Sequence, residues 1–141
     1  MIRKAEIKDI NVLMAIENAC FAKPYSYESF LSDMQGDKVT IFVEEQNAEI
    51  VGFVSLYVFL DEANLQQIAV LPSHRRNGYA ENLINYSKQY LKERNVKKFY
   101  LEVNETNTIA IKVYEKTGFK KVITRKNYYG NDSAIVYEVL L

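Results

Sequence analysis

Residues 65–93 constrain the fold most strongly, because an apolar strand, a cationic turn and a long helix follow one another there without a break. The strand pattern, residues 65–71, ends at Pro72, which lacks the backbone N–H that a sheet ladder needs. A polar turn covers residues 73–77. Helical spacing then takes over, with one stripe formed by Ala80, Leu83, Ile84, Ser87, Tyr90 and Leu91. A strand that leads directly into a helix is typical of an α/β fold.

The turn between this strand and this helix has the chemistry of an anion site. Arg75, Arg76 and Asn77 supply donors, and Gly78 lets the backbone approach a ligand closely. The first N–H groups of a helix have no partner within it, and the helix dipole is positive there. We therefore expect a phosphate-bearing ligand at this turn. The alternative is an exposed basic turn that caps an ordinary surface helix. The Gly-Lys pair of a Walker loop and the Gly-x-Gly-x-x-Gly of a dinucleotide fold are both missing.

The composition indicates one folded domain, residues 1–141, without bulk charge. The chain has 18 Lys plus Arg and 18 Asp plus Glu residues, so its formal net charge is zero and does not draw it to nucleic acid or to an anionic membrane. We expect no nucleic-acid binding, no membrane association and a cytoplasmic location. The single cysteine, Cys20, lies in an apolar helical pattern and is expected to be a buried, inert thiol. No His/Cys/Asp cluster has metal-ligand spacing, so we predict no metal.

The pattern along the whole chain predicts a mixed sheet with about four helices. Strands are expected at residues 2–5, 39–44, 50–60, 65–71, 99–103, 119–125 and 134–140, with turns at 61–64 and 127–132. Helices are expected to begin after Asp9, Ser26, Gly78 and either Thr106 or Asn107, and Gly118 should close the last one. Short links favour an antiparallel meander for residues 39–71, whereas the helix after Gly78 joins two parallel strands. The fold class is therefore α/β, a mixed, mostly antiparallel twisted sheet with a central parallel βαβ unit.

Two motifs on these elements resemble those of one enzyme family. Residues 75–80, Arg-Arg-Asn-Gly-Tyr-Ala, fit Arg/Gln-x-x-Gly-x-Gly/Ala. Residues 107–119 fit Asn-x-x-Ala-x-x-Leu-Tyr-x-x-x-Gly-Phe, with the expected helical stripe Ile109, Ala110, Val113 and Tyr114 and with Val113 where Leu is usual. In these motifs and in its element order, the chain resembles the GNAT N-acetyltransferases over essentially its whole length. Residues 60–63, 101–103 and 125–129 are most similar to the ribosomal-protein-alanine N-acetyltransferase branch.

This resemblance implies that acetyl-CoA is the cosubstrate and that the parallel βαβ unit splays apart to bind it. The residues of the turn would hold its pyrophosphate: Arg75, Arg76, Asn77, Gly78, Tyr79 and Ala80. The strand residues Ile68, Ala69 and Val70 would offer main-chain groups to the pantetheine amides, in the manner of an added strand. Asn107 and Tyr114, on the next helix, would contact the pantetheine arm and its sulfur.

Acyl transfer to an amine needs a base for the amine and a proton donor for the leaving thiolate. Glu102 is the candidate base, because it lies near the carboxyl end of its strand, where ligands bind in open α/β sheets, and on the opposite face from Leu101. Tyr114 is the candidate acid, because a phenol with a pKa near 10 stays protonated at neutral pH. The resemblance implies the same two roles, with direct attack by the amine in a ternary complex. A solvated strand residue and a packed helix aromatic are the alternative readings.

The resemblance also implies where the acceptor lies and what it is. Pro24 and Tyr25 in one loop, and Tyr128 and Tyr129 in another, would flank a channel for a peptide N-terminus. The expected partner is a protein N-terminus, in particular the N-terminal alanine of a small-subunit ribosomal protein. The oligomeric state is left open.

Two other functions stay open at this stage. The first is acetylation of a lysine side chain or a small amine such as a polyamine, for which Asp61 and Glu62 could form an acidic pocket. The second is a CoA-binding module without turnover, which the presence of both Glu102 and Tyr114 argues against.

Overall fold

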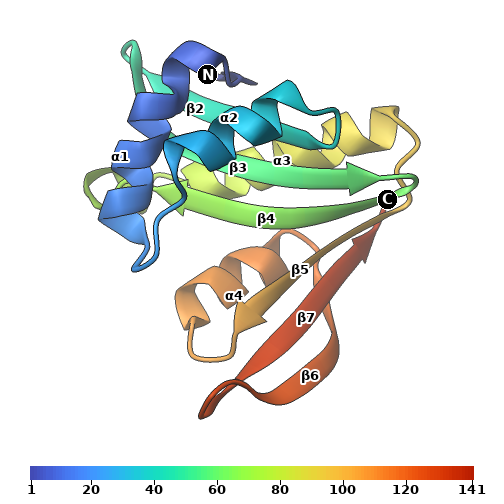
Figure 1. The fold of residues 1–141 in the computed structure, drawn as a ribbon. Coiled ribbons are helices and arrows are strands. Elements are labelled where there is room, and N and C mark those ends of the chain that lie inside the picture. The colour runs from blue at the N-terminus through green and yellow to red at the C-terminus, as the bar shows by residue number, and fades with distance from the viewer.

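The computed structural model describes residues 1–141 as one seven-stranded sheet with helices on both faces (Figure 1). The strands lie in the order β1-β2-β3-β4-β5-β7-β6, and only the central pair, β4 and β5, is parallel. The strand bounds are Ile2–Lys4 (β1), Val39–Gln46 (β2), Glu49–Phe59 (β3), Glu62–Val70 (β4), Lys98–Asn104 (β5), Lys120–Tyr129 (β6) and Asp132–Leu140 (β7). The helices are Ile10–Cys20 (α1), Tyr27–Gln35 (α2), Tyr79–Glu93 (α3) and Thr108–Lys116 (α4), with short 3₁₀ turns at Ile7–Asp9 and Pro72–His74. The predicted fold class, meander and parallel βαβ unit are confirmed.

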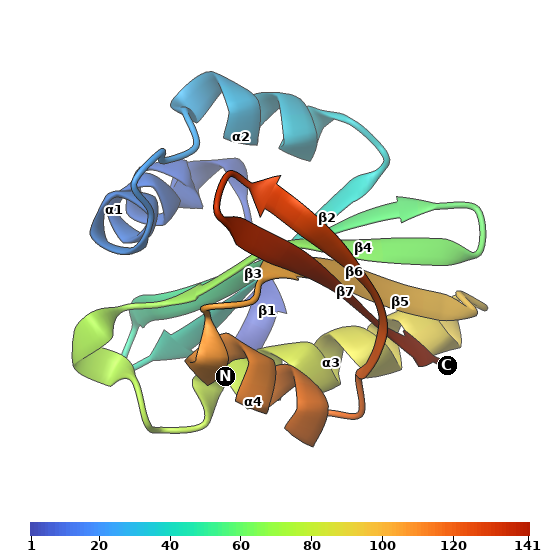
Figure 2. The same cartoon turned by 90° about the horizontal axis from the view of Figure 1, so that it is seen from below.

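Helices α1 and α2 lie on one face of the sheet, and α3 and α4 lie on the other (Figures 1 and 2). Each face has its own apolar core. The core beneath α1 and α2 is built from Ile10, Leu13, Ile16, Phe30, Ile41, Val43, Ile50, Phe53 and Ala69. The larger core beneath α3 and α4 includes the predicted helical stripe of α3, because Leu83, Ile84, Ser87 and Leu91 are buried. None of the helices is long and apolar enough to span a membrane.

Polar residues at the helix ends act largely as predicted. Ser26 caps α2 by accepting a hydrogen bond from the Ser29 N–H at 3.1 Å. Asn107 caps α4, because its side-chain oxygen accepts from the Ala110 N–H at 3.3 Å. Gly118, with a φ of +100°, closes the same helix in the left-handed conformation that glycine allows.

The capping role predicted for Asp9 was wrong. Asp9 does precede α1, but its carboxylate makes no hydrogen bond to the helix backbone. It accepts instead from the Arg3 guanidinium and from the Glu6 N–H, both at 2.8 Å. The ion pair holds the pKa of Asp9 below its usual value, with burial acting in the opposite direction.

Two predicted turns are shorter in the structure. The link between β3 and β4 is only Leu60 and Asp61, with Leu60 at a φ of 55°, so residues 62–64 belong to β4. Strand β6 continues to Tyr129 and turns at Gly130 and Asn131. Its pairing with β7 is interrupted between Arg125 and Tyr129, where Asn127 has a φ of 56°. A bulge of this kind accommodates polar residues inside a strand, which is why the sequence indicated a loop.

The two halves of the sheet meet along a very short parallel pairing and then separate. β4 and β5 pair only at Glu62 with Lys98, Ala63 with Phe99 and Asn64 with Tyr100. Beyond this point β4 stays with β3 and β5 stays with β7, and the two strands diverge in Figure 1. The edge of β4 that faces β5 therefore has no strand partner from Leu65 to Val70. The short turn between β6 and β7 lies on the same side of the sheet as α1 and α2 (Figure 2).

We call the separation of β4 from β5 beyond Asn64 and Tyr100 the fork. Gly52 of β3 pairs with Val70 at the end of β4, and the close packing there allows a stability prediction. A Cβ at Gly52 would lie 2.8 Å from the carbonyl oxygen of Ala69 in β4, whereas a Cβ at Gly36 would meet no atom closer than 3.5 Å. We expect Gly52→Ala to lower the free energy of unfolding by about 1–3 kcal/mol because backbone must move to make room. The matched variant Gly36→Ala should change it by less than about 0.5 kcal/mol. Urea unfolding measures both, and equal effects would contradict the steric argument.

Candidate functional site

A cleft of about 750 Å³ opens where β4 and β5 separate. It is lined by the end of α1, the second half of β4, the turn before α3, the first part of α3, and α4. All the predicted cofactor residues except Asn77 line it: Ile68, Ala69, Val70, Arg75, Arg76, Gly78, Tyr79, Ala80, Asn107 and Tyr114. The fork in the sheet thus brings residues from three distant parts of the chain to one cavity.

Asn77 shapes the turn from outside the cleft. Its side-chain amide donates to the carbonyl oxygens of His74 at 2.9 Å and Arg75 at 3.3 Å. These bonds hold a backbone in which Arg76 and Gly78 have φ values of 67° and 77°. The left-handed conformation is strained for Arg76, which indicates that the turn is held in a definite shape.

The start of α3 leaves three backbone donors free at the cleft. Gly78 precedes the helix and has no side chain to cap it. The first helical bond runs from Asn82 N–H to the Gly78 carbonyl at 2.9 Å, so the N–H groups of Tyr79, Ala80 and Glu81 have no partner. A Cβ at Gly78 would meet no protein atom within 4 Å, so this backbone is open to a ligand. Free donors and the positive end of the helix dipole together make an anion site.

The two arginines of the turn have different surroundings. The Arg75 side chain is anchored, because its Nε donates to the Val70 carbonyl oxygen at 3.1 Å and its guanidinium lies 3.6 Å from the Cys20 sulfur. Arg76 is exposed and makes no hydrogen bond or ion pair within the chain. Arg75 therefore ties the turn to β4 and α1, and Arg76 is free to pair with an anion.

Sequence reasoning missed several residues that line the cleft. Ile109 was expected in the core beneath α4, but it is 80% exposed and lines the cleft together with Lys112 and Lys116. These residues share one face of α4 by helical spacing, and that spacing is the signal that could have revealed them. Lys116 also pairs with Glu81 of α3 at 3.0 Å, so the two helices are bridged beside the cleft.

The expectation that Cys20 is buried was also wrong. Cys20 is half-buried and lines the same cleft as the turn before α3. The apolar pattern of α1 does not show this, because the residue lies in the last turn of the helix and its surroundings depend on β4 and Arg75.

Tyr114 lies on α4 at the inner wall of the cleft. Its side chain is 7% exposed and packs edge-on against Phe119 with ring centroids 5.9 Å apart. Burial raises the pKa of the phenol to about 12. With this pKa the phenol is protonated at neutral pH. Its O–H makes no hydrogen bond within the chain, so it is available to a ligand.

Glu102 lies on the other face of β5, as alternation with the buried Leu101 predicted. Its carboxylate contacts the Arg125 guanidinium of β6, with Nε 3.4 Å from Oε1. The pKa of Tyr129 is raised, first by burial and then by the negative charge of Glu102. Tyr128 lies against Tyr129 edge-on at 5.2 Å and beneath Arg125 at 5.8 Å. The structure thus brings both predicted acceptor tyrosines to the neighbourhood of the predicted base.

The other predicted acceptor residues lie in the loop between α1 and α2. Pro24 is exposed, and Tyr25 is half-buried against Phe30 with ring centroids 5.0 Å apart. The Tyr25 hydroxyl donates to Asp33 at 3.0 Å, so this phenol is already engaged in holding the loop.

Glu17 is a buried acid that sequence reasoning did not single out. Its side chain is fully buried at the end of α1, and one oxygen accepts from the Tyr25 N–H at 3.2 Å while the other has no partner. Burial raises the pKa of the carboxyl, and the bond from the Tyr25 backbone and the nearby Gln67 side chain oppose this. Glu17 therefore ties the loop between α1 and α2 to α1. No sequence signal marked Glu17, because Ile10, Leu13 and Ile16 with their neighbours already form an apolar face of α1 without it.

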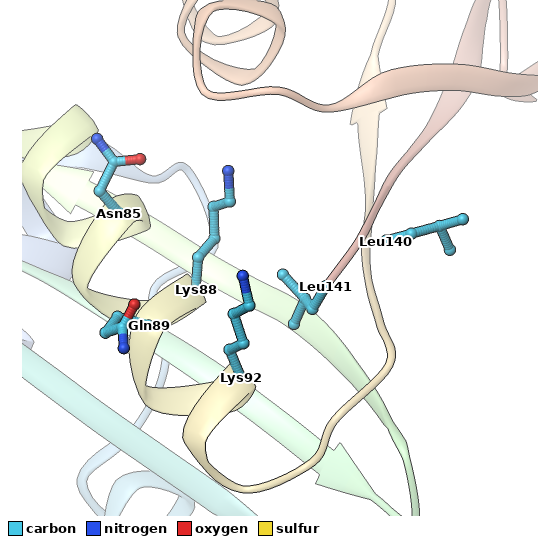
Figure 3. Close-up of a pocket in the computed structure, with 6 residues that line it drawn as sticks. All are labelled: Asn85, Lys88, Gln89, Lys92, Leu140 and Leu141. Carbon is cyan, nitrogen blue, oxygen red and sulfur yellow. The ribbon is translucent and has the colours of Figure 1, made fainter.

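A second hollow, of about 330 Å³, lies between α3 and the last residues of the chain (Figure 3). It is lined by Asn85, Lys88, Gln89, Lys92, Leu140 and Leu141. Lys88 is already bound to the Thr117 carbonyl oxygen at 2.7 Å. This hollow has none of the predicted site residues and no candidate base, so the chemistry belongs to the fork.

Comparisons with known proteins agree with this geometry. The model of the Acetyltransferase (GNAT) family matches residues 10–119. The chain is 35% identical over 139 residues to a [ribosomal protein bS18]-alanine N-acetyltransferase of Escherichia coli (strain K12), which covers 96% of this chain and 93% of the relative. It is 31% identical over 143 residues to an N-alpha-acetyltransferase of Sulfurisphaera tokodaii, which covers 92% of this chain and 86% of the relative.

Solved structures support the same relationship. The crystal structure of an Escherichia coli ribosomal-protein-alanine N-acetyltransferase superimposes with a TM-score of 0.91 at 33% identity, over 99% of this chain and 92% of that chain. The superposition therefore includes both parts of the sheet, β1 to β4 and β5 to β7.

The raised pKa of Glu17 predicts a pH-dependent cost to stability. A carboxyl whose pKa is higher in the folded chain favours folding below its unfolded pKa, near 4.3, and this contribution is lost as pH rises through the folded pKa. Glu17→Gln keeps an acceptor for Tyr25 without the charge. We expect its Tm to exceed that of the wild type by roughly 2–8 °C at pH 7.5, and by less at pH 5.

The exposed Glu49→Gln is the control, with no pH-dependent gap expected. A Glu17→Gln gap that is the same at both pH values in thermal melts would contradict the raised pKa.

Proposed function

The chain belongs to the acetyltransferase (GNAT) family, and we propose on that basis that it transfers the acetyl group of acetyl-CoA to the α-amino group of a protein N-terminus. The observation that carries the proposal is the separation of β4 from β5 after three residue pairs, because the cleft with the predicted cofactor residues borders β4 beyond that point and Glu102 lies on β5 beyond it. The relatives named for N-terminal acetylation match nearly the whole chain. Among protein N-termini, we propose the N-terminal alanine of a small-subunit ribosomal protein, as named for the Escherichia coli relative.

The residues at the cleft fit acetyl-CoA. The unpaired N–H groups at the start of α3 and the free Arg76 would hold the pyrophosphate, as charge-assisted hydrogen bonds favour. The unpaired edge of β4 at Ile68, Ala69 and Val70 would hold the pantetheine amides as an added strand would. Asn107 uses its oxygen as a helix cap, so its NH₂ remains to donate. The cofactor supplies an acetyl thioester, whose C–S bond breaks as the new N–C bond forms.

Glu102 would take the proton of the attacking amine, directly or through water. An α-amine has a pKa near 8, so an appreciable fraction is neutral at pH 7 and a weak base is enough. The side chain is partly exposed and does not line the cleft. Pro24 and Tyr25 on one side, and Tyr128 and Tyr129 on the other, would hold the acceptor backbone near this carboxylate.

Tyr114 would stabilise the leaving sulfur by hydrogen bonding. Its pKa of about 12 lies well above the value near 8.5 of an ordinary thiol. A thiolate is therefore too weak a base to take the proton fully from this phenol, although a short hydrogen bond still lowers the energy of the departing charge. This refines the sequence-based role of general acid into that of a hydrogen-bond donor.

The acidic pocket considered for a lysine or polyamine acceptor is not formed in the structure. Glu62 pairs with Lys98 at 3.5 Å, and Asp61 is exposed in the turn between β3 and β4. Both residues lie at the closed end of the fork, where β4 and β5 are still paired. Neither carboxylate is placed beside Glu102.

Acceptor choice and both catalytic roles can be tested together. We expect acetylation of an Ala-starting hexapeptide at its N-terminal nitrogen, and little transfer to the same peptide with a blocked N-terminus and an internal Lys, or to spermidine. Glu102→Gln should lower kcat by about 10²-fold and Tyr114→Phe by about 10-fold or more, because each removes one hydrogen-bonding role in the reaction. Free CoA thiol and peptide mass measure the outcome.

The exposed Tyr86→Phe on α3 is the control and should retain full activity. Transfer to Lys or spermidine alone would replace the proposed acceptor, and unchanged turnover in Glu102→Gln would remove its role as base. Release of no thiol with any amine, despite bound acetyl-CoA, would favour a binding module.

The two arginines of the turn predict different defects in cofactor use. Arg76→Gln should raise the KM for acetyl-CoA by roughly tenfold without changing the Tm, because it removes one phosphate contact. Arg75→Gln should lower the Tm as well, since Arg75 ties the turn to β4 and α1. Lys92→Gln in the second hollow is the control, with an unchanged KM. A raised KM in Lys92→Gln would move the phosphate site to that hollow.

A further inference from the structure

We propose that Arg125 is a specificity-determining residue that reserves Glu102 for an acceptor amine arriving without its proton. The inference rests on the proposed function and explains how the same site would select α-amines over lysine side chains. Arg125 has no role in the assignments made above for the cofactor, the base or the hydrogen-bond donor.

The sheet register places the two side chains on one face. Glu102 of β5 pairs with Val136 of β7, and Arg125 of β6 pairs with Ala134 of the same strand, two residues away. The side chains therefore reach across β7 on the same side, and Nε lies 3.4 Å from the carboxylate. The guanidinium also lies over the Tyr128 ring at 5.8 Å. Tyr128 lies in the stretch of β6 where pairing with β7 is irregular, between Arg125 and Tyr129. This bulge therefore places the Tyr128 ring against the Arg125 guanidinium.

The other charged and titratable groups on this face leave Arg125 as the one cation at Glu102. On β5 itself, the Lys98 ammonium pairs with Glu62 at 3.5 Å and with Glu138 of β7 at 3.9 Å. Tyr100 lies between Lys98 and Glu102 on the same face of β5. On β6, Tyr129 is a further titratable group near Glu102, because the charge of Glu102 contributes to its raised pKa after burial. Asp132 and Glu105 are turned to Asn104 and to the Ser133 N–H.

A cation already on the carboxylate changes what the acceptor meets. A protonated amine approaching Glu102 would come close to the guanidinium, and like charges at such distances repel. A neutral amine meets no such repulsion and can donate a hydrogen bond to the carboxylate. Arg125 should therefore weaken binding of ammonium and lower the pKa of the bound acceptor amine.

This preference distinguishes the two classes of biological amine. An α-amine has a pKa near 8 and a lysine side chain has one near 10.4, so the neutral fraction at pH 7 differs by roughly two orders of magnitude. Without Arg125, the carboxylate would attract a lysine ammonium that cannot attack. With Arg125, a lysine loses most of its electrostatic attraction to the site.

A charge-based role can be separated from a merely structural one by two variants. Arg125→Gln removes the charge and keeps a long polar side chain, whereas Arg125→Lys keeps the charge. The pH dependence of kcat, which reports the groups of the bound complex, is measured with saturating Ala-starting hexapeptide. Inhibition of that reaction by the N-blocked Lys peptide is measured in parallel.

In Arg125→Gln we expect the acid limb of kcat to move up by about one pH unit, because the bound amine keeps its proton to higher pH. The Lys peptide should inhibit about tenfold more tightly. Arg125→Lys should match the wild type in both measurements. An unchanged KM for acetyl-CoA in all three proteins shows that the fold of the cleft is kept.

Coincident acid limbs in Arg125→Gln and wild type, or equal shifts in the Gln and Lys variants, would overturn the charge role of Arg125 while leaving the enzyme itself intact. A wild type that acetylates no N-terminal peptide would instead overturn the proposed function, and this inference with it.

Discussion

The structure depends on the pairing of β4 with β5 over only three residues of each strand. This pairing is long enough to join the two halves of the sheet and short enough to let them separate. Each strand then follows its antiparallel partner, β3 or β7, along nearly its whole length. The result is an edge of β4 without a strand partner, next to the unpaired backbone N–H groups at the start of α3. A ligand with amides and phosphates matches these groups.

The fork also divides the chemistry between two faces of the sheet. Tyr114 belongs to the core beneath α3 and α4, where burial keeps its phenol protonated. Glu102 lies on the opposite face of β5 from the buried Leu101, where it is partly exposed and paired with Arg125. A buried neutral donor and an exposed charged acceptor are the environments that their proposed roles require. A donor molecule held on one side and an acceptor arriving from the other can meet only where the strands part.

Much of the fold and of the site could be predicted because the signals are local. The order of strands and helices, the cap at Ser26 and the closing Gly118 each depend on a few neighbouring residues. The family assignment, from two motifs, is confirmed by the comparisons. The errors fall where distant contacts decide. Asp9 prefers Arg3 to its own helix, Ile109 faces a cleft instead of a core, and Cys20 lies beside Arg75. The turns at residues 61–64 and 127–132 were misplaced because polar residues can also lie at the start of a strand, as at 62–64, or in an irregular edge strand, as in β6.

The sequence by itself determined the fold class, the cationic turn before α3 and the residue types available for acyl transfer, since hydrophobic period, glycine positions and motif spacing are properties of short segments. Only the tertiary structure decided that β4 and β5 separate after three residue pairs, that Glu17 holds the Tyr25 loop, and that Arg125 lies on Glu102. These contacts join residues in different strands, or a helix and the loop that follows it. Their existence depends on strand register and on burial, which no local pattern specifies.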